Sequence, residues 1–270
     1  MKKDILLIGD TVSACRVALS AMEPVLSHYG FTVSCLPTAI VSNTFGYKKV
    51  AQVSTGDYVA KSLAAWQEMD FVFDSIYVGY ITDPGRAAAV ADYCSLAAAK
   101  GTRIFHDPIM GEDGHLYYGM NSDTAALHKA IVPHTTHSVP SWTEAAFLTG
   151  RDFTQRPTEE QLWQTAADLQ AMGAENVVIT SCILDGADFT ACLDAAGEKA
   201  LLPCDHIPVK VAGTGDLFAA FYMARVLSGD AVAAAARKAM DSVRTLVQLS
   251  ENDADTLRGV HLAQHLSKIK

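Results

Sequence analysis

Short runs of apolar or β-branched residues alternate with longer amphipathic stretches along most of the chain. Such short runs are typical of buried strands, and apolar residues repeated three and four positions apart are typical of helices. Strands are predicted at residues 4–9, 31–36, 75–78, 103–105 and 176–180, with a hairpin at 188–193 and 199–202. Helices are predicted at residues 16–29, 55–67, 84–100, 123–131, 215–227 and 231–248, with a short one near 261–269. This alternation predicts an α/β fold in which helices cover both faces of a central, mostly parallel sheet.

Two helix starts in the middle of the chain carry a capping signal. Ser141 precedes Glu144 by three residues, and Thr158 precedes Gln161 at the same spacing. In a capping box each of the two side chains bonds the backbone N–H of the other residue, so both positions predict the start of a helix. The first of these helices is expected to end near Gly150. Because no linker, repeat or biased segment interrupts the pattern, we predict a single domain over residues 1–270.

Composition favours a folded protein in a reducing compartment. Half of the residues are hydrophobic and 19% are charged, so the chain can bury a core and does not belong to the disordered class. Six cysteines lie scattered without a C-x-x-C pair, which is typical neither of disulfide scaffolds nor of zinc sites. No apolar run approaches the roughly 18 residues of a membrane span, and the first run, residues 5–9, is too short for a signal peptide. We therefore expect a cytoplasmic protein.

The net charge of −9 restricts the partners that the chain can bind. A negative mean field repels phosphates, so we expect neither nucleic acid nor an anionic membrane as a partner. A small anionic ligand stays compatible with this charge, because a local group of backbone N–H donors can hold an anion whatever the net charge. His134 and His137 stand three residues apart, but no acidic ligand is near them in the sequence, so they are interpreted as solvated loop residues.

The most informative segment is Val-Ala-Gly-Thr-Gly-Asp at residues 211–216, which leads into an Ala-rich predicted helix. Its two glycines allow a sharp turn that presents consecutive N–H groups at the positive end of the helix, where an oxyanion or a phosphate can bind. A carboxylate at Asp216 could then accept a proton from a substrate hydroxyl beside the phosphoryl group. The alternative is an ordinary loop before a helix whose dipole favours an acid. The segment is not a dinucleotide fingerprint, because Phe218 stands where a third glycine is needed, and the chain has no P-loop sequence.

Three weaker candidates follow other predicted elements. Residues 106–114 carry three carboxylates and two glycines, which suits Mg²⁺ near phosphates but equally suits a polar turn. Glu144, in the first turn of its helix, could hold a metal through a water molecule. The strand predicted at 176–180 ends in two hydroxyls, Thr180 and Ser181, that could bond phosphate oxygens.

Taken together, these segments resemble the pyridoxal kinases of the ribokinase-like superfamily, from about Ile5 to Gln248. Residues 213–220, Gly-Thr-Gly-Asp-Leu-Phe-Ala-Ala, are similar to the catalytic turn of that family, and residues 107–111, Asp-Pro-Ile-Met-Gly, to its nucleotide loop. Three further segments resemble the family's ATP-side strand, its substrate-side turn and its Ser-Asn-x-x-Gly-Tyr loop, namely residues 177–181, 79–80 and 42–47.

The resemblance implies an ATP- and Mg²⁺-dependent kinase for the 5′-hydroxymethyl group of pyridoxal, pyridoxine or pyridoxamine. Asp216 would be the general base, and the amides of Gly213, Thr214 and Gly215 would form the anion hole for the γ-phosphoryl group. The implied ATP-binding residues are Asp107, Asp113, Ser141, Thr180, Ser181 and Thr214, and the implied metal-binding residues are Asp107 and Glu144. The implied vitamer-binding residues are Asp10, Val41, Thr44, Phe45 and Tyr80. The resemblance also implies a homodimer and leaves open a requirement for a monovalent cation.

The chain departs from the family pattern mainly in the part that would bind the substrate. Asp10 replaces a serine of the family, Phe45 replaces a small polar residue of its lid loop, and Ser141 replaces an asparagine of its acid loop. Two alternatives therefore stand beside a B6 kinase. One is a ribokinase-like kinase for another hydroxymethyl heterocycle such as hydroxymethylpyrimidine. The other is a protein that binds nucleotide or vitamer without catalysis.

Overall fold

The computed structural model describes residues 3–117, 120–205, 207–251, 253 and 255–269. It consists of parallel strands and of helices that pack on them. Contacts divide the chain into two compact units, residues 1–55 with 206–270 and residues 56–205. Each unit is described by itself below, and the single domain over residues 1–270 stays a prediction. Both units confirm the predicted α/β class with mostly parallel strands.

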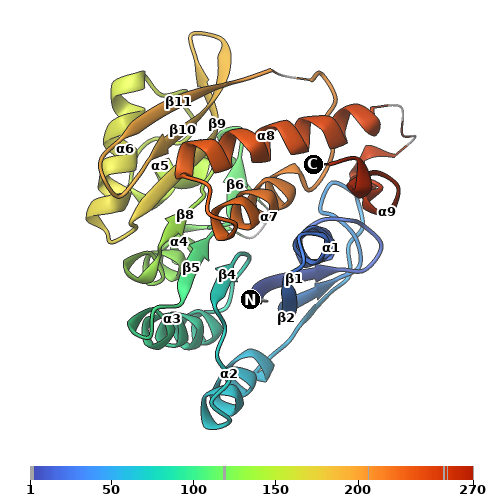
Figure 1. The fold of residues 1–270 in the computed structure, drawn as a ribbon, viewed down its shortest axis with the longest axis vertical. Coiled ribbons are helices and arrows are strands. Elements are labelled where there is room, and N and C mark those ends of the chain that lie inside the picture. The colour runs from blue at the N-terminus through green and yellow to red at the C-terminus, as the bar shows by residue number, and fades with distance from the viewer. Residues whose placement is uncertain (1–2, 118–119, 206, 252, 254, 270) are drawn as a thin grey trace. The chain divides into compact units, whose positions relative to one another are not determined.

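The first unit combines the N-terminal strands with the C-terminal helices (Figure 1). Its strands are β1 (Asp4–Val12), β2 (Thr32–Val41) and β3 (Gln52–Ser54). Its helices are α1 (Leu19–His28), α7 (Thr214–Leu227), α8 (Val232–Leu249) and α9 (Leu262–His265), with 3₁₀ turns at Thr256–Arg258 and Leu266–Lys268. β1 pairs in parallel with β2, and β3 pairs antiparallel to β2. Helix α1 packs on β1, β2 and α7, and α7 packs on α8, so α7 is buried on most of its surface.

The first predicted helix begins three residues later than expected, and the first two strands are longer than expected. Residues 13–18 do not continue into a helix, because their backbone bonds elsewhere. Ser13 N donates to Val41 O at 2.8 Å, and Arg16 N donates to Arg258 O at 2.7 Å. β1 extends through the polar positions after Gly9 because its pairing with β2 continues, with a register shift between Gly9 and Asp10. The sequence patterns do not predict the short strand β3.

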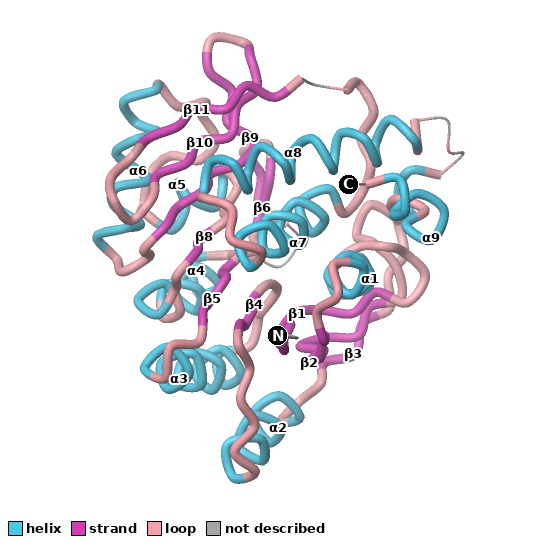
Figure 2. Tube along the Cα trace, viewed as in Figure 1, coloured by secondary structure: helices cyan, strands magenta, loops and turns pink. Residues whose placement is uncertain are grey.

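The second unit has parallel strands that end in an antiparallel hairpin (Figure 2). Its strands are β4 (Ser75–Val78), β5 (Arg103–His106), β8 (His137–Ser138), β9 (Asn176–Leu184), β10 (Ala187–Leu193) and β11 (Lys199–Cys204), in the order β11-β10-β9-β8-β5-β4. A separate hairpin joins β6 (Gly111–Glu112) and β7 (His115–Leu116). Its helices are α2 (Tyr58–Glu68), α3 (Pro84–Ala99), α4 (Ser122–Lys129), α5 (Trp142–Leu148) and α6 (Glu159–Ala171), with a 3₁₀ turn at Val132–His134.

Both predicted capping boxes are confirmed. Ser141 and Thr158 are the N-caps of α5 and α6, and each exchanges hydrogen bonds with the residue three positions on. A third box, Asn121 with Thr124, caps α4. Among the described residues, no helix combines the length and the apolar character needed to cross a membrane.

Two sequence expectations in this unit are wrong. Strand β9 does not end at Thr180 but continues to Leu184, because β10 returns alongside it and pairs with it as far as Ala187. His137 is not a solvated loop residue. It lies in β8 with 5% of its surface exposed, and its ring stacks on Phe105 with 4.7 Å between the ring centroids.

Candidate active site

The residues predicted for the site are distributed over both units. Asp10, Val41, Thr44, Phe45 and residues 213–216 belong to the first unit. The second unit holds Tyr80, Asp107, Asp113, Ser141, Glu144, Thr180 and Ser181.

In the first unit, a glycine turn opens helix α7. Gly213 is the N-cap, with a left-handed φ of +82°. A Cβ atom at this position would lie 2.9 Å from both the Arg16 carbonyl oxygen and the Val17 Cγ1, so a side chain has no room there. Thr214 is the first helical residue and Gly215 is exposed. Because backbone N–H groups in the first turn of a helix have no partner within the helix, this end of α7 suits an anion.

Asp216 lies in the first turn of α7 and is half-buried. Its Oδ2 accepts a hydrogen bond from the Ala18 backbone N–H at 2.7 Å. Ala18 is the N-cap of α1 and has a φ of +51°, so the start of a second helix holds the carboxylate. Helix N-termini stabilise negative charge, and this arrangement therefore favours and orients a carboxylate beside the glycine turn.

Asp10 lies on β1 directly after the register shift and is 8% exposed. Burial raises the pKa of its carboxyl from 3.8 to about 7; the nearby charge of Asp216 adds to this rise, and its own backbone N–H opposes it. Among the described residues, no lysine or arginine forms an ion pair with Asp10. The first unit thus brings together two carboxyl groups, of which Asp10 is the more deeply buried.

The loop over residues 42–50 is attached to the 3₁₀ turn at Thr256–Arg258 and to the residue before it. The Thr44 hydroxyl donates to the Leu257 carbonyl oxygen at 3.2 Å, and the Tyr47 hydroxyl bonds the Asp255 carboxylate. Val41, at the end of β2, is buried, and Phe45 is 43% exposed. Sequence reasoning missed the anchor at residues 255–258, because no local pattern reports contacts across about two hundred positions.

The same loop borders a cavity of about 470 Å³, lined by Ala14, Cys15, Asn43, Tyr47, Lys48, Lys49, Asp255 and Arg258. Both lysines are exposed.

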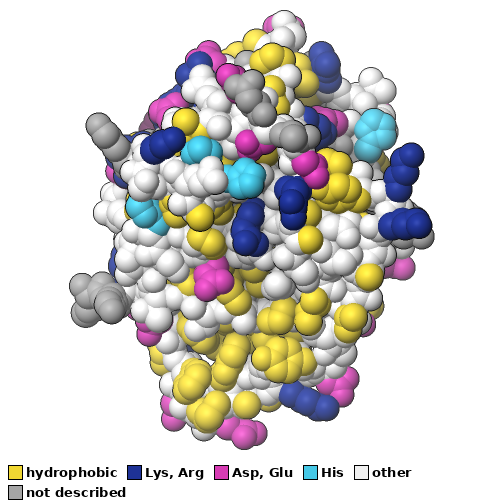
Figure 3. All heavy atoms as spheres, turned by 90° about the vertical axis from the view of Figure 1, so that its right-hand side faces the viewer, with side chains coloured by type: hydrophobic (Ala, Val, Ile, Leu, Met, Phe, Trp, Pro, Cys, Tyr) yellow, Lys and Arg dark blue, Asp and Glu magenta, His cyan; other side chains and the backbone are white. Residues whose placement is uncertain are grey.

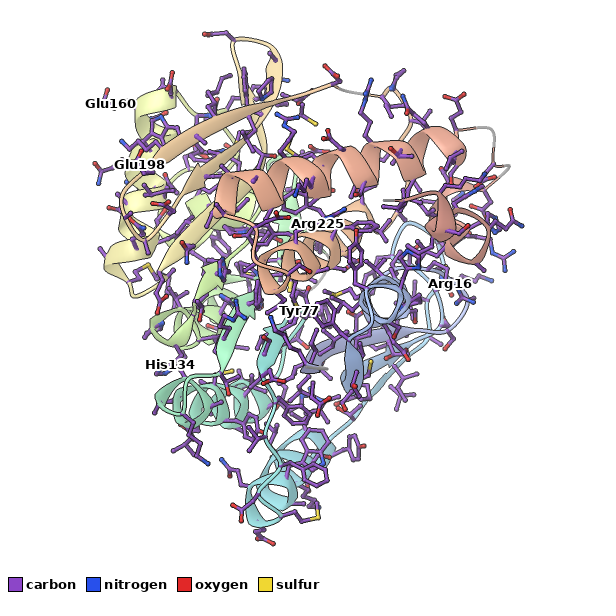
Figure 4. The ribbon with its side chains drawn as sticks, in the orientation of Figure 1. Arg16, Tyr77, His134, Glu160, Glu198 and Arg225 are labelled. Atoms are coloured by element: carbon purple, nitrogen blue, oxygen red, sulfur yellow. The ribbon has the colours of Figure 1, made fainter. Side chains whose placement is uncertain are left out.

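In the second unit, Asp107 directly follows β5 and is 8% exposed. The Tyr77 hydroxyl on β4 (Figure 4) donates to its Oδ2 at 3.0 Å. A Cβ atom at Gly79 would lie 2.9 Å from the Tyr77 ring, so this glycine leaves room for the tyrosine that orients Asp107. Tyr80 follows in the same turn and is 7% exposed. The sequence does not single out Tyr77, because it is one of four residues in a short apolar strand.

Glu144 connects the segment after β5 to helix α5. Its Oε1 accepts the backbone N–H groups of Met110 at 2.9 Å and Gly111 at 3.2 Å, and its Oε2 accepts that of Ser141 at 2.7 Å. The side chain is 5% exposed, and burial raises its pKa to about 7 although these hydrogen bonds oppose the rise. Both carboxylate oxygens thus bind backbone N–H groups, which fix the side chain, and the contact of Glu144 with a metal through a water molecule stays a prediction.

Ser141 and Thr180 are neighbours in the second unit. An isolated parallel bridge joins the two residues, and Thr180 N donates to Pro140 O at 2.9 Å. The Ser141 hydroxyl donates to the Gly111 carbonyl oxygen at 2.9 Å. Thr180 and Ser181 together oppose one residue of β10, so they form a β-bulge in which Ser181 is exposed and has a φ of +56°. The hydroxyls therefore lie at a bulge and not at the end of a strand.

Asp113 and Gly114 form the two-residue turn between β6 and β7, with φ values of 53° and 75°. Two successive positive φ angles are typical of a type I′ hairpin turn, for which Asp-Gly is a preferred pair. Gly114 N donates to the Thr143 hydroxyl at 2.9 Å, which joins this hairpin to α5. Asp113 itself is exposed. The Asp-Gly pair was a signal in the sequence from which the hairpin could have been predicted.

The donors around residues 107–144 are oxygen atoms, which is the ligand type that Mg²⁺ prefers. Within the described ranges, no group of three or more His, Cys, Asp or Glu side chains could hold a metal ion. This donor set suits Mg²⁺ bound through one carboxylate and the phosphates of a nucleotide, which is its usual mode in phosphate-transferring sites.

Comparisons with known proteins agree on one family. The family model described as phosphomethylpyrimidine kinase matches residues 22–260. A pyridoxine/pyridoxal/pyridoxamine kinase of Bordetella bronchiseptica is 25% identical over 250 residues, which cover 87% of this chain and 85% of that protein.

Two solved structures share the fold. A Bacteroides thetaiotaomicron protein assigned as a phosphomethylpyrimidine kinase, crystallised with pyridoxal, has a TM-score of 0.93 at 25% identity and covers 100% of this chain and 96% of its own. The pyridoxal kinase of Lactobacillus plantarum has a TM-score of 0.88 at 27% identity, over 99% of this chain and 96% of its own. The chain therefore belongs to the phosphomethylpyrimidine kinase family of the ribokinase-like superfamily, and it is a phosphotransferase that acts on an alcohol group.

Proposed function

We propose that the chain uses ATP to phosphorylate the 5′-hydroxymethyl group of a B6 vitamer, that is, pyridoxal, pyridoxine or pyridoxamine. The observation that carries this proposal is Asp216, held by the Ala18 N–H at 2.7 Å in the first turn of α7, directly after the Gly213 N-cap. A base and an anion-binding helix end at adjacent residues are what phosphoryl transfer to an alcohol requires. The pyridoxal bound by the Bacteroides protein and the substrates in the name of the Bordetella relative support a vitamer as the alcohol.

In the proposed reaction, the Asp216 carboxylate takes the proton of the 5′-hydroxyl. The oxygen forms a bond to the γ-phosphorus of ATP, and the bond from that phosphorus to the bridging oxygen breaks, so that ADP leaves and a phosphate ester forms. The amides of Gly213, Thr214 and Gly215 stabilise the negative charge on the transferred group. Because this chemistry needs positioning and charge neutralisation more than covalent catalysis, amides and one carboxylate suffice on this side.

The roles proposed for the remaining residues follow the resemblance. Asp107 and, through water, Glu144 would hold Mg²⁺, which supplies neutralisation of the phosphate charge. ATP would contact Asp107, Asp113, Ser141, Thr180, Ser181 and Thr214, and the vitamer would contact Asp10, Val41, Thr44, Phe45 and Tyr80. The homodimer, the cytoplasmic location and a monovalent cation stay predictions.

The first test is the variant Asp216→Asn. We expect its kcat to fall by about two to four orders of magnitude, the usual contribution of a general base, with the KM for ATP changed little. Turnover is measured as ADP release and as vitamer phosphate formed. The matched control is Asp241→Asn, an exposed aspartate of α8 whose carboxylate pairs with Arg237. Equal turnover in the wild type and in Asp216→Asn would refute the proposed base.

A second candidate substrate is hydroxymethylpyrimidine, which is favoured by the description of the family model over residues 22–260. Comparing kcat/KM across pyridine and pyrimidine alcohols discriminates the two kinases. A protein that only binds its ligands would instead show a heat of binding in calorimetry and no ADP release with either alcohol.

A further inference from the structure

Asp10 is a buried carboxyl group, and among the residues that the structure describes no lysine or arginine pairs with it. Its side chain is 8% exposed, and the contacts described for it are its own backbone N–H and the repulsion from Asp216. The backbone places the two acids near each other, because Thr11 bridges to Ala18 and the Ala18 N–H bonds Asp216. Burying a carboxyl group without a cation is costly. The free-energy cost of burying Asp10 is offset if a ligand brings a positively charged group to it.

The chemistry of the proposed substrates shows where such a charge would come from. In each of them, the ring position next to the hydroxymethyl group carries a second substituent. This substituent is an aminomethyl group in pyridoxamine, an aldehyde in pyridoxal, a hydroxymethyl group in pyridoxine and an amino group in hydroxymethylpyrimidine. If Asp216 takes the proton of the hydroxymethyl group, the substituent on the next ring atom is also held near Asp216, and Asp10 is the second carboxyl group described there.

We propose that Asp10 is a specificity-determining residue that binds a nitrogen with N–H donors on the ring substituent next to the reacting hydroxymethyl group. This inference rests on the proposed function and extends it. An ammonium or amino group donates to the carboxylate, and an ammonium also neutralises its charge. An aldehyde oxygen only accepts, so above about pH 7, where Asp10 is ionised, the two groups repel each other. A serine, which the resemblance places at this position in the family, can donate or accept and therefore discriminates much less.

The test measures selectivity and not activity alone. The kcat/KM values for pyridoxamine and pyridoxal are compared in the wild type, Asp10→Asn and Asp10→Ser. We expect the ratio of pyridoxamine to pyridoxal to fall by about tenfold in both variants, mostly through the KM for pyridoxamine, because a charge-assisted hydrogen bond is lost. Asp4→Asn is the matched control, since Asp4 is an exposed aspartate of the same strand.

Calorimetry without ATP provides a readout that does not depend on turnover. We expect the Kd for pyridoxamine and for hydroxymethylpyrimidine, which both carry an amino group, to rise by about tenfold in the Asp10 variants. The Kd for pyridoxal should stay within a factor of two or fall. Thermal melting of each variant confirms that it is folded.

The possible results separate this inference from the function on which it rests. If the wild type phosphorylates vitamers but the ratio is the same in all three proteins, Asp10 does not set specificity and the kinase assignment stands. If both substrates lose kcat equally while the pH–rate profile shifts, Asp10 acts through Asp216 and the inference is also overturned. If the wild type phosphorylates no vitamer, the B6 function fails, and the calorimetric comparison of the amines still decides the role of Asp10.

Discussion

At the scale of single residues, the first unit brings together two aspartates that lie more than two hundred positions apart in the chain. Asp216 is held by a backbone N–H at a helix start, whereas Asp10 is buried on a strand. Two neighbouring carboxyl groups do not ionise together easily, so the environment assigns the proton to one of them. Burial and the Asp216 charge keep the proton on Asp10 up to about pH 7, and above that pH Asp10 ionises.

Asp10 also makes the stability of the protein depend on pH. Its pKa is raised from 3.8 to about 7 by folding, so the folded state binds more protons than the unfolded state between these values. The resulting destabilisation is absent below pH 4, grows up to about pH 7 and is constant above it. We therefore expect Asp10→Asn to raise the free energy of unfolding by a few kcal/mol at pH 8 and to change it little at pH 4.

Urea unfolding at both pH values measures this difference. Asp4→Asn serves again as the control, because Asp4 is exposed. A gain in stability that is the same at pH 4 and at pH 8 would contradict the titration of a buried Asp10.

At the scale of elements, the start of α7 depends on a close contact with the segment before α1. Gly213 and Gly30 have the same φ of +82°, but their surroundings differ. A Cβ at Gly213 would lie 2.9 Å from the Arg16 carbonyl oxygen, whereas a Cβ at Gly30 would meet nothing within 4 Å. The two glycines thus separate the cost of the backbone conformation from the cost of crowding.

We expect Gly30→Ala to destabilise the protein by about 1–2 kcal/mol, which is the cost of a left-handed conformation for a residue with a side chain. Gly213→Ala should cost about 1–3 kcal/mol more, because the added methyl group also forces the backbone apart. It should lower kcat as well, since the amides of the turn move. Equal losses of unfolding free energy in the two variants, with kcat unchanged in both, would refute this account.

In the second unit, the capping box at the start of α5 also bonds the loop after β5. Glu144 bonds the N–H groups of Met110 and Gly111 as well as that of Ser141, and the Ser141 hydroxyl bonds Gly111 O. The cap and the proposed nucleotide loop are therefore one hydrogen-bonded structure. A capping box in the sequence predicts only the helix start, because the partners in the loop lie about thirty positions away.

At the scale of the whole molecule, a net charge of −9 and a function that handles phosphate are compatible. Lysines and arginines are mixed with acids on the surface, as Figure 3 shows on one face, where dark-blue side chains lie near magenta ones. In the proposed function, the backbone N–H groups at the start of α7 would supply the positive potential for a phosphoryl group locally.

The cysteines give a prediction for the whole molecule. Cys35 and Cys204 are exposed, and the other four cysteines are buried. Burial raises the pKa of the Cys94 and Cys182 thiols to about 12, and that of Cys35 to about 11, so none of these three is activated. We expect a thiol reagent to label only the two exposed cysteines of the native protein, Cys35 more slowly than an ordinary thiol, and all six after denaturation. Rapid native labelling of more than two would contradict the buried positions.

Much of the fold was predictable from local patterns, and the element boundaries that were predicted wrongly have a common cause. The strand at Ser75–Val78 and the starts of α5 and α6 match their predictions, because apolar runs and capping boxes act over a few residues. The start of α1 and the ends of β1 and β9 do not match, because their backbone groups bond segments remote in sequence. The predicted site residues are placed by the structure, but their roles stay proposals.

The sequence by itself determined the α/β class, the glycine turn before an acid at Asp216 and the resemblance to the kinase family, since all three follow from patterns of neighbouring residues. Only the tertiary structure decided that Ala18 holds Asp216, that Glu144 bonds the loop after β5, and that Asp10 is buried next to a second carboxylate. The physical reason is that burial and charge depend on which distant segments pack together, and no local pattern contains that information.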